Sequence, residues 1–147
     1  MVAVCERAGD NVLITHSSGG VSGWTTAIKG ELPAVEDTTS PFPAAGQGVS
    51  REEFMRLTKI PIVVYFGDNI PNGDKPVANW GFDNRRTRLN LARKWAAVVN
   101  SCGGDVEIVC LPDVGVTGST HFMMADLNNV AVADVMNRWL KSKGLAN

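Results

Sequence analysis

The chain has 147 residues, of which 44% are hydrophobic and 20% are charged, and its formal net charge is -1. This length supports one domain with a hydrophobic core and is too short for two ordinary ones, so residues 1–147 are expected to form a single domain. Near-neutral charge gives no reason to expect binding to nucleic acid or to an anionic membrane surface. No apolar run approaches the roughly 20 residues that span a bilayer.

The N-terminus shows no basic segment followed by an apolar one, so no secretory signal is expected and the cytoplasm is the default location. Three cysteines (Cys5, Cys102 and Cys110) do not have the spacing of a metal site, since Cys102 and Cys110 are eight residues apart with no histidine nearby, so no metal is expected. One disulfide with a leftover thiol and a fully reduced chain both remain open, and the usual burial of cysteine favours reduced thiols.

In the first half of the chain, short apolar segments alternate with segments of helical periodicity. Residues 2–8 are typical of the end of a helix, and residues 11–15 predict a buried strand. A helix is expected from the glycines at 19–20 to Gly30, followed by a weak strand over 31–35 and a Pro- and Gly-rich loop over 37–50. Ser50 and Glu53 predict a capping box ahead of a short helix.

The second half has clearer elements: strands over 60–66 and 106–111, a helix over 84–100, a long turn over 112–120 and an amphipathic helix over 128–142. Strands that alternate with helices predict an α/β fold, with a small parallel sheet and helices on both of its faces. The basic run at 85–88 is interpreted as a solvated helix face.

A serine stands at the apex of the stretch NVLITHSSGGVSGW, between the expected strand and the expected helix. This is the order of a nucleophile elbow, in which a strained turn exposes a serine hydroxyl at the end of a sheet. Sites in such sheets form at the carboxyl ends of strands, and Ser17, Asp68 and His121 all follow strands. His16 is expected to point away from Ser17, so His121 is the candidate base and Ser17 the candidate nucleophile.

Two readings compete with the elbow. Ser17 could cap the following helix while His121 serves as a loop histidine. A phosphate-binding loop is disfavoured, because the glycines do not match G-x-G-x-x-G and no Lys-Ser/Thr pair follows them.

Three segments carry a resemblance to a known family. THSSGG at 15–20 resembles the small-H-S-x-G-G elbow of α/β-hydrolases. KIPIVVYFGDNIP at 59–71 and GSTHFMMADLNN at 118–129 are similar to the K-I-P-I-x-x-x-F-G-D-x-I and G-N-S/T-H-F-x-x-x-D-x-N-N segments of an esterase-like branch. The resemblance covers nearly the whole chain but only the C-terminal half of the usual fold. It implies a truncated α/β-hydrolase-like domain that cleaves carboxylic esters of small molecules without a cofactor.

Two carboxylates compete for the acid of the triad. Asp68 follows the strand at 60–66, where most α/β-hydrolases carry this acid, whereas the esterase-like branch uses a position that matches Glu36. The residues after Glu36 are Asp-Thr instead of Pro-Gly and the preceding strand is shortened, which favours Asp68. The N–H of Ser18 is the expected first oxyanion donor, and the second normally comes from the half of the fold that has no counterpart here.

Aromatic residues in or beside the loops above the expected site would line a substrate pocket: Trp24, Phe42, Trp80 and Phe82. The strands without a counterpart would leave a sheet edge beside the elbow, which favours a homodimer. The rival hypothesis is a non-catalytic remnant or assembly module that keeps the elbow as a scaffold. It predicts that Ser17 and His121 do not approach within hydrogen-bond reach, about 2.6–3.2 Å.

Overall fold

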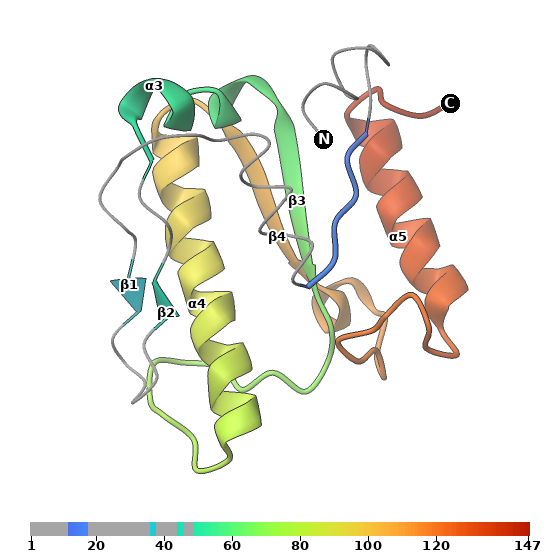
Figure 1. The fold of residues 1–147 in the computed structure, drawn as a ribbon. Helices are drawn as coiled ribbons and strands as arrows, with labels where there is room; N and C mark the ends of the chain where they lie inside the picture. The colour runs from blue at the N-terminus through green and yellow to red at the C-terminus, as the bar shows by residue number, and fades with distance from the viewer. Residues whose placement is uncertain (1–11, 18–35, 38–43, 46–48) are drawn as a thin grey trace.

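The computed structural model describes residues 12–17, 36–37, 44–45 and 49–147. Their elements are β1 (Glu36–Asp37), β2 (Ala44–Ala45), α3 (Arg51–Phe54), the 3-10 helix η1 (Leu57–Lys59), β3 (Pro61–Phe66), α4 (Trp80–Ser101), β4 (Asp105–Cys110), the 3-10 helix η2 (Leu111–Val114) and α5 (Asn129–Ser142). β3 and β4 form a parallel sheet with α4 on one side and α5 on the other (Figure 1). The predicted α/β architecture, with helices on both faces of a small parallel sheet, is confirmed.

Apolar side chains on both faces of the sheet explain why two helix layers cover it. β3 and β4 pair in register along all six residues, and successive side chains of a strand point to opposite faces. Val106 and Ile108 pack into the core that α4 completes, while Tyr65 and Val109 pack against the core that α5 completes. Strands covered on both faces are rich in apolar residues, and accordingly β3 is apolar throughout and β4 is apolar except at Asp105 and Glu107.

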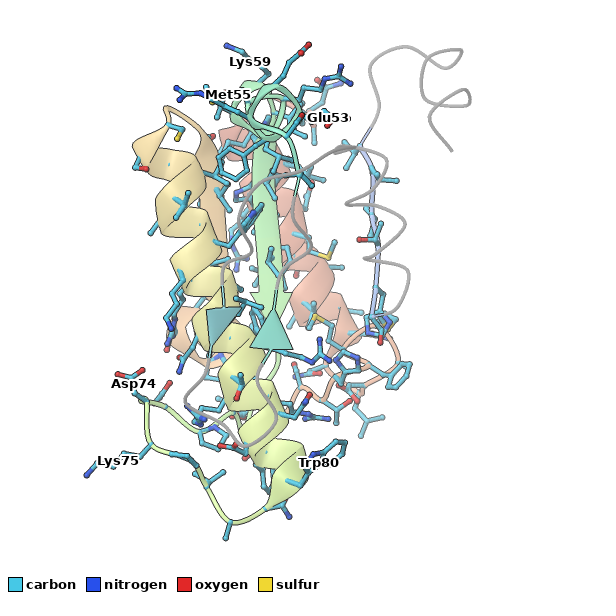
Figure 2. The ribbon with its side chains drawn as sticks, turned by 60° about the vertical axis from the view of Figure 1, so that its left-hand side comes forward. Glu53, Met55, Lys59, Asp74, Lys75 and Trp80 are labelled. Carbon is cyan, nitrogen blue, oxygen red and sulfur yellow. The ribbon has the colours of Figure 1, made fainter. Side chains whose placement is uncertain are left out.

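Helix α4 runs antiparallel to β3, so that its first turns lie at the carboxyl end of the sheet. Figure 2 shows Trp80, the first residue of α4, at the opposite end of the molecule from Met55 and Lys59, which precede β3. This places the N-terminal half of α4 beside the edge where sites form in parallel sheets.

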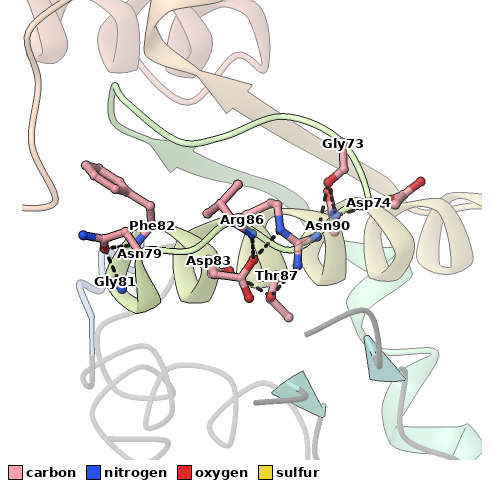
Figure 3. A network of polar contacts seen from close by, with 10 residues as sticks. Gly73, Asp74, Asn79, Gly81, Phe82, Asp83, Arg86, Thr87 and Asn90 are labelled. Carbon is pink, nitrogen blue, oxygen red and sulfur yellow. Dashed lines mark hydrogen bonds and ion pairs between the residues drawn. The ribbon is translucent and has the colours of Figure 1, made fainter. Parts of the chain in front are cut away.

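A buried arginine ties the first turns of α4 to the loop that leaves β3. Arg86 is fully buried, and its Nε donates to Oδ1 of Asp83 at 2.8 Å. Its Nη1 donates to the carbonyl oxygen of Gly73 at 3.2 Å, and the amide of Val77 donates to the same Asp83 oxygen at 3.0 Å (Figure 3). A buried charge is tolerated only when paired and hydrogen-bonded, so this network fixes the loop against the helix.

Two expectations for this region are wrong. Helix α4 begins at Trp80 and not at residue 84, because the side chain of Asn79 caps it by accepting from the amides of the second and third helical residues. Trp80 and Phe82 are consequently helical and not in a loop. The run at 85–88 is not a uniformly solvated face either, since Arg86 is buried.

Two further expectations for the first half also differ from the structure. Residues 12–16 are not in a strand, because a strand requires a hydrogen-bonded partner and β3 pairs only with β4 among the described residues. The apolar side chains of Val12, Leu13 and Ile14 are exposed. β1 and β2 form a short antiparallel pair within the region expected to be a loop. The helices expected over 2–8 and 21–30 and the strand over 31–35 lie outside the described residues.

The remaining elements agree with their sequence signals. The hydroxyl of Ser50 accepts from the amide of Glu53 at 3.3 Å and donates to its carboxylate at 2.6 Å, so the expected capping interaction starts α3. Helix α5 begins at Asn129, and Gly144, with φ of 70°, follows its C-terminal end. No helix within the described ranges combines the length and apolarity needed to cross a membrane.

Candidate active site

A serine and a histidine from distant parts of the chain meet at the carboxyl end of β3. In the view of Figure 1, the segment 12–17 is drawn between β3 and α5. The Oγ of Ser17 lies 3.0 Å from Nε2 of His121, although the two residues are 104 positions apart. This distance is within the reach of about 2.6–3.2 Å that a nucleophile and its base require. The rival hypothesis of a non-catalytic scaffold predicts that Ser17 and His121 are not in contact.

The backbone at Ser17 is left-handed, with φ of 51°. Residues other than glycine seldom adopt this conformation, because Cβ crowds the backbone there, and such strain is concentrated at functional sites. A strained turn at the serine is the geometry expected of a nucleophile elbow, and both Ser17 and His121 are open to solvent.

Asp68 holds the loop that carries His121. Its amide donates to the carbonyl oxygen of Ser119 at 2.7 Å, and its carboxylate accepts from the amides of Gly118 at 2.9 Å and Asn69 at 2.6 Å. These two amides, Gly118 first, hold the pKa of Asp68 below its usual value, so the group is ionised at neutral pH. Within the described residues no carboxylate is hydrogen-bonded to the ring of His121.

The same loop is held from its other side by Asp126. The amide of Thr120 donates to Oδ2 of Asp126 at 2.5 Å, and the Thr120 hydroxyl donates to Oδ1 at 3.0 Å. The amide of Phe122 in turn donates to the Thr120 hydroxyl at 3.1 Å. Asp126 therefore acts on the backbone that flanks His121 and not on its ring.

Gly67 allows the end of β3 to touch this loop. A Cβ on Gly67 would overlap the carbonyl oxygen of Thr120 and lie 2.8 Å from that of Ser119. Both obstacles are backbone atoms, so they can give way only if the loop that carries His121 moves.

If Ser17 and His121 act as a catalytic pair on esters, Gly67→Ala should lower kcat for an activated ester about 10-fold or more, because a displacement of about 1 Å at a catalytic group can cost about 10²-fold. Gly81→Ala is the matched control, since a Cβ there meets a single side-chain atom at 3.4 Å. Steady-state kinetics of both variants, with thermal unfolding to verify their fold, test this. Equal kcat values for the two would refute the role of Gly67.

His16 lies beside the site, a contact that sequence reasoning missed. Its Nε2 donates to the carbonyl oxygen of His121 at 2.8 Å, and the two ring centroids are 4.7 Å apart. Partial desolvation, then His16 and the guanidinium groups of Arg85 and Arg88, hold the pKa of His121 below its ordinary value. The imidazole therefore stays neutral, and able to accept a proton, to a lower pH than an isolated histidine.

The other expected site residues are only partly described. Phe82 lines a shallow hollow of about 340 Å³ together with Asn69, Ile70 and Pro71, whereas Trp80 is 61% exposed. Ser18, Trp24, Phe42 and the side chain of Glu36 lie outside the described part of the chain. The backbone of Glu36 belongs to β1.

The structure of a bacterial esterase is similar to this chain, with a TM-score of 0.69 and 26% sequence identity. The match covers 99% of this chain and 42% of the esterase, so the chain spans less than half the length of that protein. No protein-family model and no curated protein matches the sequence. The likeness is consistent with a truncated α/β-hydrolase-like fold.

Proposed function

We propose that this chain is a serine hydrolase that cleaves carboxylic esters through an acyl-enzyme on Ser17. The observation that carries the proposal is the 3.0 Å contact between Ser17 Oγ and His121 Nε2 at the carboxyl end of the sheet. The left-handed backbone at Ser17 and the likeness to a bacterial esterase support it.

The proposed reaction needs only groups of this chain and water. As Ser17 Oγ attacks the ester carbonyl carbon, His121 Nε2 takes the hydroxyl proton and then gives it to the departing alcohol. A water molecule next loses a proton to His121 and attacks the acyl-enzyme, and the proton returns to Ser17 as the carboxylic acid leaves. The amide of Ser18 is the proposed oxyanion donor.

Asp68 is the proposed acid of the triad, with Glu36 as the alternative. Asp68 is ionised and already hydrogen-bonded to the loop of His121. To act on the ring, one carboxylate oxygen would accept from Nδ1–H of His121, a contact that can form when substrate binds, since catalytic hydrogen bonds are often looser without it.

Labelling with a fluorophosphonate tests the proposal directly. We expect the wild-type chain to be labelled on Ser17 and to release nitrophenol from a para-nitrophenyl ester. Ser101→Ala, a change at an exposed serine at the end of α4, serves as the control and should be labelled normally. A folded wild-type chain that resists the reagent would exclude the serine mechanism and favour the non-catalytic module.

We also propose that two copies of the chain associate. Val12, Leu13 and Ile14 expose apolar side chains next to the site, with Ile14 at 67% exposure, and burying such surface favours association. Sedimentation equilibrium should give twice the mass of one chain, and Ile14→Lys should shift the chain toward the monomer. A wild-type chain that stays monomeric at assay concentration would contradict this.

A further inference from the structure

The arginines in the first half of α4 are of two kinds. Arg86 is buried, and its hydrogen bonds to Asp83 and Gly73 hold the fold together. Arg85 is half-buried and Arg88 is exposed, and no carboxylate within the described residues forms an ion pair with either. The Nε of Arg88 donates to Oδ1 of Asn84 at 2.9 Å, which orients the side chain and leaves its terminal amino groups for another acceptor.

The position of these arginines follows from where α4 passes the sheet. Arg93 contacts the sulfur of Cys110, the last residue of β4, at 3.7 Å. A helix rises 1.5 Å per residue, so the backbone of Arg88 lies about 7.5 Å, and that of Arg85 about 12 Å, further toward the start of α4. Both residues therefore stand beyond the carboxyl edge of the sheet, where Ser17 and His121 meet.

Helical spacing also connects the pair to the hollow. Phe82, Arg85 and Arg88 follow one another at three-residue intervals, so each is a surface neighbour of the next. Phe82 lines the hollow of about 340 Å³, and another lining residue, Asn69, directly follows Asp68. The two guanidinium groups also act on the ring of His121, since they help to lower its pKa.

We propose that Arg85 and Arg88 bind a carboxylate on the ester substrate, so that the preferred substrates are esters that carry a free carboxylate. Guanidinium groups match carboxylates through paired hydrogen bonds, and an arginine pair that has no ion-paired acid among the described residues is suited to a ligand that supplies one. The inference rests on the proposed ester hydrolysis at Ser17.

The test compares esters that differ in charge but not in shape. For an acyl-side carboxylate, the para-nitrophenyl monoester of glutaric acid is paired with the ester in which isopropyl replaces the carboxylate. For an alcohol-side carboxylate, the butyrate ester of para-hydroxybenzoate is paired with para-isopropylphenyl butyrate. Wild type should prefer the anionic member of at least one pair, and Arg85→Gln or Arg88→Gln should each lower that kcat/KM ratio about 3- to 10-fold.

Arg138→Gln is the charge-matched control, because Arg138 is exposed on α5 and contacts none of the described site residues; its ratio should equal that of wild type. A second readout is the acid limb of kcat/KM. Removing Arg85 removes a cation that lowers the pKa of His121, so the limb should move to higher pH in Arg85→Gln and stay in place in Arg138→Gln.

Failure of this inference differs from failure of the proposed function. Hydrolysis without preference for charge, or ratios that Arg85→Gln and Arg88→Gln leave unchanged, would overturn the inference while the esterase proposal stands. If no ester is hydrolysed, the esterase proposal fails. Calorimetry then measures how tightly the Ser17→Ala variant binds the glutarate monoester, and so tests whether the arginines recognise a carboxylate. Binding weakened about 3- to 10-fold by adding Arg85→Gln supports it, and equal binding overturns it.

Discussion

Ser17→Ala is expected to lower kcat for a para-nitrophenyl ester by about 10⁴-fold or more, because a triad without its nucleophile retains only the catalysis of its oxyanion donors and binding contacts. The substitution removes the Ser17 hydroxyl, whose oxygen lies 3.0 Å from Nε2 of His121. Burst kinetics should show an acyl-enzyme phase in wild type and none in the variant. Since Ser17 is exposed, the variant should unfold at nearly the wild-type temperature.

A double variant sharpens this expectation. Residues that act as one catalytic unit are strongly non-additive, so Ser17→Ala with His121→Ala should be about as slow as either single change. Ser101→Ala should keep wild-type kinetics. If Ser17→Ala retains more than about a tenth of the wild-type rate, the nucleophile lies elsewhere and the elbow is only a scaffold.

Elements whose signals are local were predictable from the sequence. β3 is a continuous apolar run, β4 is apolar except at Asp105 and Glu107, and α5 has an amphipathic period, so each was located to within about a residue at its ends. The contact between Ser17 and His121 was expected because residues that follow parallel strands meet at one edge of a sheet. The structure contains this contact, but residues 12–16, which precede Ser17, are not in a strand.

Features that depend on a distant partner could not be predicted. Arg86 lies in a basic run that is typical of a solvated face, and its burial is tolerable because partners such as Asp83 and the loop carbonyl of Gly73 accept its hydrogen bonds. Residues 12–16 have the composition of a strand but lack a strand partner among the described residues. The role of His16 depends on where the carbonyl of His121 falls, which its adjacency to Ser17 does not reveal.

Asp68→Asn is expected to lower kcat by about 10² to 10⁴-fold, whereas Glu36→Gln should cost less than about 10-fold. The carboxylate of Asp68 accepts from the amide of Gly118 in the loop of His121, and an amide in the acid position of a triad leaves the histidine in the wrong tautomer, at a cost of about 10⁴-fold. The lower end of this range, about 10²-fold, is the loss expected if Asp68 only holds the loop through its bond to Gly118. Steady-state kinetics and thermal unfolding of both variants give the comparison.

Asp126→Asn provides the control for loop holding, because Asp126 supports the same loop from its other side without any bond to the ring of His121. A loss in Asp68→Asn that exceeds the loss in Asp126→Asn by 10-fold or more marks a charge that acts on the imidazole. Equal losses would restrict Asp68 to positioning the loop. A larger loss in Glu36→Gln than in Asp68→Asn would transfer the acid role to Glu36, because only the acid of the triad determines which nitrogen of His121 accepts the proton of Ser17.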